Sequence, residues 1–484
     1  MSNPNAHDFI DGGFAVPGER LSGTVDDPNT GEVLEPQVAT SRTGVEQALA
    51  AADRVHAERS WLDFGAAGRA ELLVDLAAEL ALRAQEIADS ESINPGIVIS
   101  LARAIAGGCA EQVLGVTAQL NESGDFSELP GKGRGGPVRL RRDPWGPALV
   151  LVPWNAPAPT AVGKSAAALA AGCPVIVKPS EWAPGSSRIL AQAIAAVGFP
   201  AGVFQLVHGG AAVGSQLAGD ARIRAVALTG GQEAGRSIAA LAAPHFTRLQ
   251  LELGGNNPVV VLEDADISLT ARALAAGMTK LNGQWCEAPG KVFVPQGMHD
   301  DLVEALLGEL RQLTIGISTE LDTNLGPLAF SEHRERLLLQ IATLTNSGGR
   351  ILSSHEQLPS RGWFLSPTLV LGVDAAKARN ELFGPVLTIH PVSDAAHALR
   401  LAQDTPDGLA GYVFGSDIGE AMDVAERLPG GEIKVNGTSL FDLTADSHQS
   451  FWGASGHGGH GAGELLEFFR GNRIVGVDNP DAPI

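Results

Sequence analysis

Cysteine is scarce in this sequence, whose 484 residues include only Cys109, Cys173 and Cys286. An odd number of widely spaced cysteines excludes a disulfide framework and a cysteine-based zinc site, and it is typical of a reducing compartment. Aromatic residues are also few, at 5% of the chain. Glycine, by contrast, occurs 59 times, and its abundance beside alanine favours close packing of helices on strands.

Long apolar runs and positive charge are missing as well. The apolar stretches are interrupted well before the ~18 residues that a membrane span needs. The first residues lack the basic region and apolar run of a signal peptide. Asp and Glu outnumber Lys and Arg by 55 to 34, for a net charge of −21, whereas nucleic-acid binders carry a basic stripe. We expect a cytoplasmic protein with neither a nucleic-acid nor a membrane partner.

Short apolar strands alternate with helices after residue 147. We predict strands at 148–152, 175–177, 203–207 and 225–228, and helices at 159–171, 185–197 and 211–218. Strands that are apolar along their whole length indicate a parallel sheet covered on both faces, as in doubly wound nucleotide-binding domains. Helical spacing also predicts helices within 43–120, and a second α/β unit begins with a strand at 258–262.

Polar residues follow the first two of these strands, where ligands bind in open α/β sheets. Asn155 can aim its amide at a developing oxyanion, or it can simply cap the next helix. Lys178 and Glu181 can bind the hydroxyls of a ribose, or they can belong to a solvated turn. The residues alone leave both pairs of alternatives open.

A third set of residues pairs a carboxylate with a thiol. Glu252 begins Glu-Leu-Gly-Gly, and Cys286 ends Gly-Gln-Trp-Cys, 34 residues later. A nucleophilic cysteine needs a setting that favours its thiolate, and a nearby Glu can activate water on an acyl-enzyme. For a lone cysteine, however, a buried thiol beside an unrelated surface Glu is the simpler interpretation.

Taken together, these segments resemble the aldehyde dehydrogenase superfamily over nearly the whole chain. The similarity rests on six motifs in family order: Pro153-Trp154-Asn155, Lys178-Pro179-Ser180-Glu181, Thr229-Gly230-Gly231 with Gly235, Glu252-Leu253-Gly254-Gly255, Gly283-Gln284-Trp285-Cys286 and Glu381-Leu382-Phe383-Gly384-Pro385. No single motif is decisive, but their order and spacing leave little room for chance.

The resemblance implies a domain organisation and a role for each site residue. It implies a Rossmann-like NAD-binding domain in residues 1–125 and 146–254, an α/β catalytic domain in 255–462, and a β-strand oligomerisation arm in 126–145 and 463–484 that joins a homodimer or homotetramer. It further implies that Cys286 attacks the aldehyde, that Asn155 and the Cys286 N–H hold the oxyanion, and that Glu252 activates the hydrolytic water. The family's cofactor-binding positions are Pro153, Trp154, Lys178, Ser180, Glu181, Gly230, Gly231, Leu253, Glu381 and Phe383.

The cofactor expected from these residues is NAD, with NADP as the alternative. Glu181 can bond the 2′-hydroxyl of NAD but repels a 2′-phosphate. Lys178 weakens this argument, since it can contact either group. No metal is expected: His448, His457 and His460 lie on irregular, glycine-rich chain, and the G-x-G-x-x-G of residues 456–461 follows no clear strand, so we interpret it as a loop of the catalytic domain.

Several positions depart from the family pattern. Gly231 replaces a serine, and Trp285 and Glu287 flank Cys286, where a carboxylate raises the pKa of the thiol unless a cation compensates. Lys280 occupies a position that often holds a substrate-lining aromatic, so it pairs with Glu287, meets an anionic substrate or points to solvent. The C-terminal segment from Phe451 is shortened, and Ala156, Thr160 and Gly163 are small. These features predict a wide pocket for a bulky or aromatic aldehyde.

The sequence is also compatible with other functions. A semialdehyde dehydrogenase acting on an anionic aldehyde is the main alternative. A CoA-acylating enzyme is disfavoured by Glu252. A non-catalytic structural relative or a cofactor-free thiol esterase is disfavoured by the retained site residues.

Overall fold

Parallel strands form the centre of the first sheet in this computed structural model, which describes residues 7–129, 135–444, 447–461 and 463–481. Their order is β9 (Phe204–Leu206), β8 (Val175–Lys178), β7 (Ala148–Leu151), β10 (Ala225–Gly230) and β11 (Arg248–Leu253). Antiparallel strands extend both edges: β1 (Asp8–Ile10) and β2 (Gly13–Ala15) beside β9, and β22 (Gly456–His457) beside β11. The predicted doubly wound sheet is confirmed.

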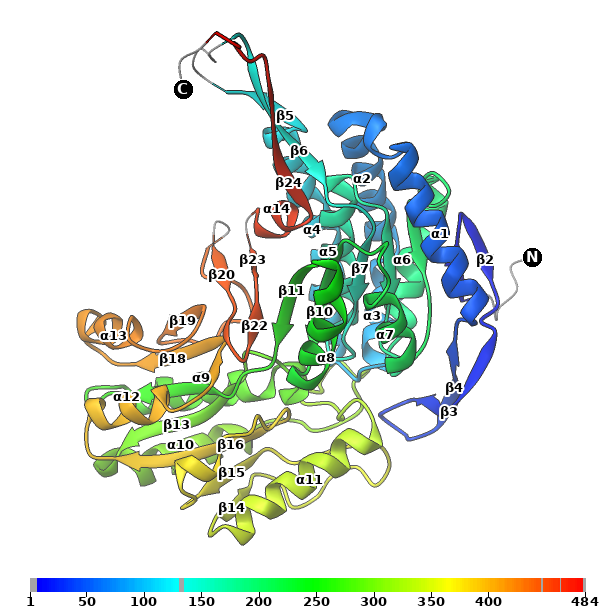
Figure 1. The fold of residues 1–484 in the computed structure, drawn as a ribbon. Helices are drawn as coiled ribbons and strands as arrows, with labels where there is room; N and C mark the ends of the chain where they lie inside the picture. Colours follow the sequence, from blue (N-terminus) through cyan, green and yellow to red (C-terminus); the bar gives the residue numbers. More distant parts are fainter. Residues whose placement is uncertain (1–6, 130–134, 445–446, 462, 482–484) are drawn as a thin grey trace.

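Helices cover both faces of this first sheet (Figure 1). Four of them connect its strands: α5 (Pro157–Ala171), α6 (Gly185–Val197), α7 (Ala211–Ala218) and α8 (Gln232–Ala242). The predicted bounds of α6 and α7 are confirmed, whereas α5 starts two residues earlier, because a proline is well tolerated in the first helical turn. The region 43–120 forms α1 (Arg42–Glu58), α2 (Gly65–Leu82), α3 (Ala84–Ile93) and α4 (Ile99–Ser123).

The second sheet is also parallel, except at one edge. Its order is β14 (Arg350–Ser353), β15 (Thr368–Leu371), β16 (Val386–Val392), β13 (Pro289–Pro295), β12 (Asn257–Val261), β18 (Ala410–Phe414) and β19 (Glu432–Val435), with β14 antiparallel. Its helices are α9 (Ile267–Thr279), α10 (His299–Leu310), α11 (Ser331–Asn346), α12 (Ala395–Gln403) and α13 (Ile418–Ala425). This sheet has an aliphatic core of its own, separate from that of the first sheet.

A three-stranded antiparallel sheet projects from the body as an arm (Figure 1). It consists of β5 (Phe126–Glu128), β6 (Val138–Pro144) and β24 (Arg470–Gly476), so it joins chain segments more than 300 residues apart. Ile474, Val475 and Val477 leave apolar surface exposed on this arm. The helix α14 (Glu464–Phe468) precedes β24 and packs against α5 in the body.

The glycine-rich segment 456–461 forms strands and not the predicted loop. β22 pairs with β11 in the first sheet, and β23 (Gly459–Gly461) pairs with β20 (His448–Ser450). Glycine is required here, because a Cβ on Gly456 would lie 1.7 Å from the Leu251 carbonyl oxygen. The segment thus reaches the sheet predicted to belong to the other domain.

The remaining short elements complete the chain. They are the hairpin β3 (Glu19–Asp26) and β4 (Val33–Ala39), the pair β17 (Asp407–Gly408) and β21 (Trp452–Gly453), and 3-10 turns at Leu62–Phe64, Ala243–His245, Lys280–Gly283, Gln296–Met298 and Ala375–Lys377. Within the described residues, every helix is too short or too polar to cross a membrane.

Candidate active site

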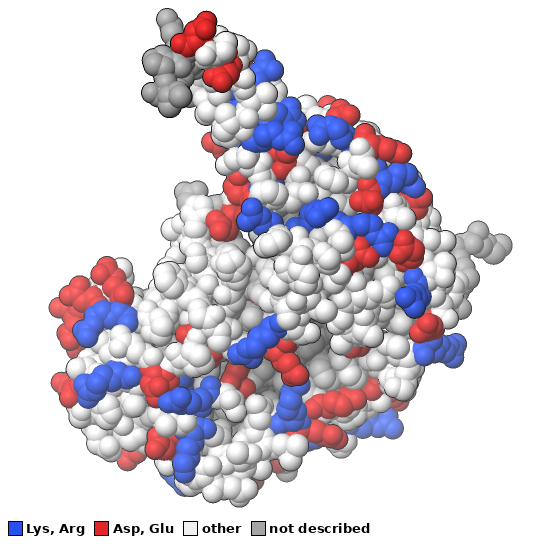
Figure 2. All heavy atoms as spheres, in the orientation of Figure 1, with Lys and Arg blue, Asp and Glu red and all other residues white. Residues whose placement is uncertain are grey.

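A cleft of about 680 Å³ separates the two sheets and contains the predicted site. The carboxyl ends of β7, β8, β10 and β11 line one side, with α8 beside them, and α11 contributes to the other. Figure 2 shows the molecule hollowed between its two parts, with charged side chains of both signs at the rim. The position of this cleft agrees with the general rule that ligands bind at the carboxyl ends of parallel strands.

Cys286 lies on a tightly held turn between α9 and β13. Leu281 and Asn282 adopt left-handed conformations there, with φ of 49° and 57°. The Asn282 amide offsets this unfavourable backbone by donating to the carbonyl oxygens of Gly96 and Pro327, at 2.7 and 2.9 Å. Asn257 donates to the Cys286 carbonyl oxygen at 2.9 Å. The backbone around Cys286 is therefore fixed from both sides.

Glu252 faces the Cys286 thiol across the cleft. The Sγ atom lies 3.5 Å from Glu252 Oε1, so the thiol can donate to the carboxylate. Burial raises the pKa of Cys286 well above its usual value, and the negative charges of Glu252, Glu287 and Glu381 raise it further. The resting thiol is consequently protonated, and Glu252 is the base in reach of its proton.

Glu252 itself stays ionised because a lysine lies behind it. Burial alone would raise its pKa, but Lys164, His460 and the hydrogen bonds from Thr229 and Cys286 outweigh this effect, and the net shift is downward. Lys164 Nζ lies 3.8 Å from Glu252 Oε2 and donates to Thr229 Oγ1 at 2.6 Å, while Thr229 donates to Glu252 at 2.9 Å. Glu252 is therefore ionised at neutral pH and can act as a base.

Sequence reasoning missed Lys164. It lies on α5 among alanines and other apolar residues, and it is buried. A single charge in a helix that is otherwise uncharged was the available signal, because an unpaired buried ammonium is costly. Burial lowers the pKa of Lys164 to about 8, although Glu252 and Cys286 counteract that shift.

Asn155 directs its amide toward the segment that carries Cys286. Its Nδ2 donates to the Gln284 carbonyl oxygen at 2.9 Å, and the side chain lines the cleft. An amide nitrogen carries two hydrogens, so one remains for an oxygen bound beside Cys286. The alternative role as a helix cap is not seen: Ala156 is the residue before α5, and it makes no side-chain cap.

The predicted cofactor residues line the same cleft. Lys178 is anchored at the end of β8 by donating to the carbonyl oxygens of Pro179 and Gly209, at 2.8 and 2.6 Å. Its ammonium lies 3.9 Å from Glu181. The cleft is also lined by the other predicted positions, namely Pro153, Trp154, Ser180, Gly230, Gly231, Leu253, Glu381 and Phe383.

Glycines allow two close approaches in this part of the cleft. A Cβ on Gly254 would lie 2.1 Å from Glu381 Oε2, and one on Gly235 would lie 2.6 Å from Leu253. Glu381 accepts a hydrogen bond from the Gly255 N–H at 3.3 Å. Burial raises the pKa of Glu381 to about 8, and that hydrogen bond opposes the rise.

Gly231 precedes the first turn of α8, where backbone N–H groups attract anions.

The donor set fits a dinucleotide. Groups that can bind ribose hydroxyls lie at Lys178, Glu181 and Glu381, and the N-terminus of α8, which is suited to a diphosphate, lines the same cleft. Aromatic rings form one wall: Trp154 packs edge-on against Phe330 and Phe383, with centroids 5.2 and 5.3 Å away. Sequence reasoning did not include α11, whose His333, Arg336 and Gln340 also line the cleft, because no motif marks them.

The seven predicted substrate residues are absent from the lining of this cleft. Ala156 packs with Cys286 against the core of the first sheet, and Gly163 faces Gln112. Phe451 lies edge-on against His460, with centroids 5.2 Å apart. Thr160 lies on the first turns of α5. Of the seven, Ala156 packs in the same apolar cluster as Cys286, and Trp285 and Glu287 adjoin Cys286 in the chain.

The suggested pairing of Lys280 with Glu287 is wrong. Glu287 instead lies 3.9 Å from Lys434 and accepts from Gln449 at 2.9 Å, because β19 and β20 approach it from the far end of the chain. Lys280 donates to the Thr438 carbonyl oxygen, and its ammonium lies 5.1 Å from the Trp285 ring centroid. Burial lowers the pKa of Lys280 to about 8, and repulsion from Lys434 contributes.

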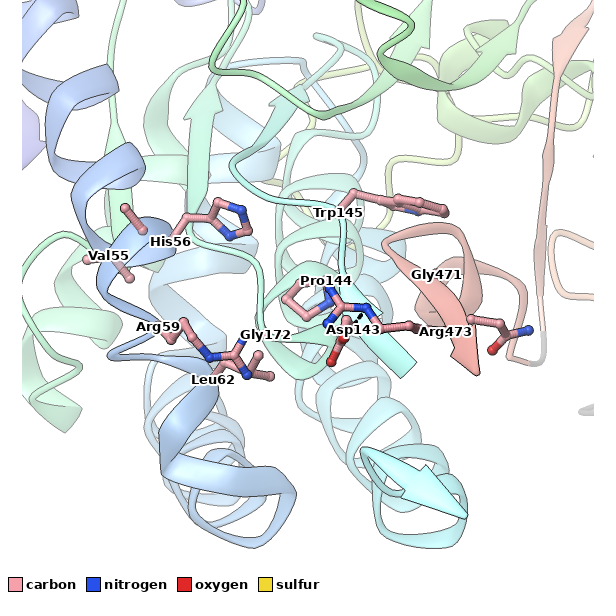
Figure 3. A pocket seen from close by; sticks show the side chains of 12 residues that line it. Val55, His56, Arg59, Leu62, Asp143, Pro144, Trp145, Gly172, Gly471 and Arg473 are labelled. Carbon is pink, nitrogen blue, oxygen red and sulfur yellow. Dashed lines mark ion pairs between the residues drawn. The ribbon is translucent and has the colours of Figure 1, made fainter. Parts of the chain in front are cut away.

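A second hollow, of about 580 Å³, lies at the base of the arm (Figure 3). Figure 3 shows His56 of α1 and Arg59, which directly follows α1, on one side of it and the ion pair between Asp143 and Arg473 on the other. It contains none of the predicted site residues. Among the residues that the structure describes, no cluster of three or more His, Cys, Asp or Glu could hold a metal ion.

Comparison with known proteins agrees with this site. Residues 17–475 match the profile described as "Aldehyde dehydrogenase family". The chain is 32% identical to geranial dehydrogenase of Castellaniella defragrans, over 90% of this chain and 92% of that protein. It is also 32% identical to the 3-succinoylsemialdehyde-pyridine dehydrogenase of a Pseudomonas species, over 90% and 91%.

Solved structures of aldehyde dehydrogenases resemble this fold as well. The fold resembles betaine aldehyde dehydrogenase of Staphylococcus aureus in complex with NAD+, with a TM-score of 0.93, 26% identity and coverage of 99% and 96% of the two chains. Lactaldehyde dehydrogenase of Escherichia coli is similar at a TM-score of 0.90 and 27% identity, with coverage of 97% and 98%. This chain therefore belongs to the aldehyde dehydrogenase family.

Proposed function

We propose that this enzyme oxidises an aldehyde to a carboxylic acid with NAD, through a thioester on Cys286. The observation that carries the proposal is the pair formed by the Cys286 thiol and the Glu252 carboxylate, 3.5 Å apart in a cleft suited to a dinucleotide. Sequence relatives named as aldehyde dehydrogenases and a structural relative that binds NAD+ support it.

The chemistry begins when the Cys286 thiol passes its proton to Glu252 and its sulfur attacks the carbonyl carbon. The Asn155 amide and the Cys286 backbone N–H then stabilise the oxyanion. Bound NAD would supply the hydride acceptor for this carbon, and the loss of hydride would leave a thioester on Cys286. Glu252, after passing its first proton to solvent, takes a proton from water as the new C–O bond forms, and the C–S bond breaks with its electron pair on the Cys286 sulfur. A carboxylate base argues against transfer to CoA.

The cofactor would lie along the line of predicted residues. Lys178, Ser180 and Glu181 would bind the adenosine ribose, Gly230 and Gly231 would approach the diphosphate, and Glu381 would bind the nicotinamide ribose. Pro153, Trp154, Leu253 and Phe383 would pack against the rings and the sugars. The carboxylate of Glu181 favours NAD over NADP, because it repels a 2′-phosphate.

Replacing Glu181 should weaken this preference. We expect Glu181→Ala to raise kcat/KM with NADP relative to NAD by about tenfold, because the repulsion disappears while the Lys178 cation remains. Steady-state NADH and NADPH formation measures the ratio, with Glu71→Ala, an exposed site on α2, as the control. An unchanged ratio would remove Glu181 from the adenosine-ribose site.

The leading substrate class is a bulky or aromatic aldehyde. Ala156, Thr160 and Gly163 offer little side-chain bulk on α5 and just before it, and Leu440, Ala156 and Cys286 pack against one apolar cluster. The two relatives named above act, by their names, on geranial and on a pyridine semialdehyde. Phe451 and Trp285 would form the remaining apolar walls of such a pocket.

An anionic semialdehyde is the second candidate, and Lys280 favours it. Among the described residues, no carboxylate forms an ion pair with this half-buried ammonium. It lies beside the ring of Trp285, the residue before Cys286. For such a substrate, Lys280→Met should raise KM about tenfold, the value expected for loss of a charged hydrogen bond of about 1.5 kcal/mol.

The test compares succinic semialdehyde with butanal, which has the same chain length but no charge. Lys280→Met should leave KM for butanal unchanged, as should the exposed control Lys377→Met for both aldehydes. Equal KM values for succinic semialdehyde in the wild type and Lys280→Met would eliminate the anionic candidate.

We also propose the domain division expected from the family. The described residues of 1–125 and 146–254 would bind NAD, those of 255–462 would carry the nucleophile, and the arm of 126–145 and 463–484 would join subunits. Exposed Ile474, Val475 and Val477 on the arm support a homodimer or homotetramer. A monomer mass from light scattering coupled to size exclusion would contradict this oligomeric state.

A further inference from the structure

The hollow at the base of the arm, called the arm-base hollow below, has no part in the proposed reaction. Of the residues that the structure describes, none lines both this hollow and the Cys286 cleft. Its volume of about 580 Å³ lies within the range of ~300–1,000 Å³ in which proteins bind small molecules. Its walls come from the end of α1 and the residues after it, the end of β6, the turn after α5 and the start of β24. A ligand in this hollow would therefore contact both the arm and the body.

An apolar wall, formed by Leu62, Pro144 and Trp145, lines part of the arm-base hollow. Two glycines let the chain close tightly around it. Gly172 ends α5 with φ of 92°, and a Cβ there would lie 3.1 Å from Leu62 and 3.5 Å from Pro144. A Cβ on Gly471 of β24 would lie 2.4 Å from the Trp145 ring. The apolar wall is consequently held in place by backbone that approaches it from the body and from the arm.

The charged side chains give this hollow an excess of positive charge. Asp143 is the one carboxylate among the described residues that line it, and two guanidinium groups share it. Its Oδ1 accepts a hydrogen bond from Arg141 at 2.8 Å, and its buried Oδ2 lies 3.3 Å from Arg473 Nε. Arg59 adds another cation, whose ion pair with Asp63, at 3.7 Å, joins two exposed side chains and so neutralises little of its charge.

His56 offers a further donor on the α1 side of the hollow. Within the described part of the chain, its ring makes no hydrogen bond. Burial lowers the pKa of His56, and the charges of Arg224 and Arg59 lower it further, although Asp53 opposes the shift. The ring is neutral at neutral pH, and one of its nitrogens carries a hydrogen that it can donate. Figure 3 shows this ring and the Arg59 side chain extending from the α1 side of the hollow.

We propose that the arm-base hollow binds an organic anion that carries a carboxylate or a phosphate group. His56 and Arg59 from the body and Arg473 from the arm would supply hydrogen-bond donors, since guanidinium groups suit both kinds of anion. The rest of the ligand would lie against the apolar wall. An inorganic ion would leave most of the hollow empty, which is why the ligand is expected to have an organic body. Its binding would connect the arm to the body.

Isothermal titration calorimetry of the NAD-saturated enzyme tests this proposal with three matched probes: 1-naphthoate, 1-naphthyl phosphate and the neutral 1-naphthamide. Saturation with NAD keeps the phosphate out of the proposed diphosphate site. We expect the tighter of the two anions, which identifies the ligand class, to bind at least about tenfold more tightly than the amide. Arg59→Gln and Arg473→Gln should each raise its Kd about tenfold, because each removes charged hydrogen bonds. Arg350→Gln, at an exposed position on β14 in the second sheet, is the control and should bind as wild type.

The two arginine variants test the site from opposite sides, so a disturbance of the arm by Arg473→Gln would not affect the result with Arg59→Gln. The proposal would be overturned if neither anion binds at concentrations up to about 10 mM, if anion and amide bind equally, or if Arg59→Gln leaves Kd unchanged. Anion binding beside Cys286 would give the last of these results and would also compete with the aldehyde. The proposal does not rest on the proposed reaction: Arg59→Gln should keep the wild-type rate of NADH formation, whereas failure of the proposed function would leave the wild type without NADH formation.

Discussion

Cys286→Ala should abolish aldehyde oxidation, with a loss of about 10⁴-fold or more in kcat/KM. No other thiol can substitute, because Cys109 and Cys173 are fully buried in the core of the first sheet, and burial raises the pKa of each to about 12. The measurement is steady-state NADH formation on a panel of aromatic, aliphatic and semialdehyde substrates.

Two controls accompany this variant. NAD binding, followed by protein fluorescence, should be retained, because the variant leaves the proposed ribose-binding residues Lys178, Glu181 and Glu381 unchanged. Cys109→Ala should retain turnover in the folded protein. A Cys286→Ala variant that still oxidises any aldehyde at more than a trace would rule out the covalent mechanism.

Glu252→Gln should separate the two halves of the reaction. The amide cannot take a proton from water, so we expect the thioester to accumulate and the steady-state rate to fall about 10²-fold. Acylation is slowed less than hydrolysis, because removal of the Glu252 charge also lowers the pKa of Cys286. Stopped-flow mixing should show a burst of about one NADH per active site, followed by a slow phase.

The pH dependence of the wild-type hydrolysis step follows from the same carboxylate. The folded environment lowers the pKa of Glu252 below its usual value, so the active, ionised form persists through mildly acidic pH. Hydrolysis should decline only when the pH falls below the range of about 4.3 that is usual for Glu. An acid limb near neutrality would contradict the role assigned to Lys164 behind Glu252.

Much of the fold follows from the sequence because its signals are local. The strands of the first sheet are apolar throughout, and glycines end α5 and α6 in left-handed conformations, at Gly172 and Gly198. Such signals specify alternation and boundaries, which is why α6 and α7 match their predicted bounds. The motifs around Asn155 and Glu252 also predict a common cleft, because Asn155 follows β7 and Glu252 belongs to the parallel strand β11.

The remaining features depend on contacts between distant segments. Lys434 reaches Glu287 from 147 residues downstream, so the local proximity of Lys280 misled the predicted pairing. Gly456–Gly461 contains almost no side chains that reveal a strand, and its pairing partners are β11 and β20. The role of Lys164 becomes evident only when α5 packs against β7 and β8 of the first sheet and Lys164 reaches Thr229 at the end of β10.

The thioester on Cys286 can be detected directly by intact-protein mass spectrometry of Glu252→Gln, quenched in acid after mixing with NAD and benzaldehyde. The thioester mechanism predicts a mass increase of one benzoyl group, mapped by proteolysis to the peptide that contains Cys286 and absent without NAD. A protein that makes NADH yet carries no acyl group, or carries it on Cys109 or Cys173, would contradict the mechanism.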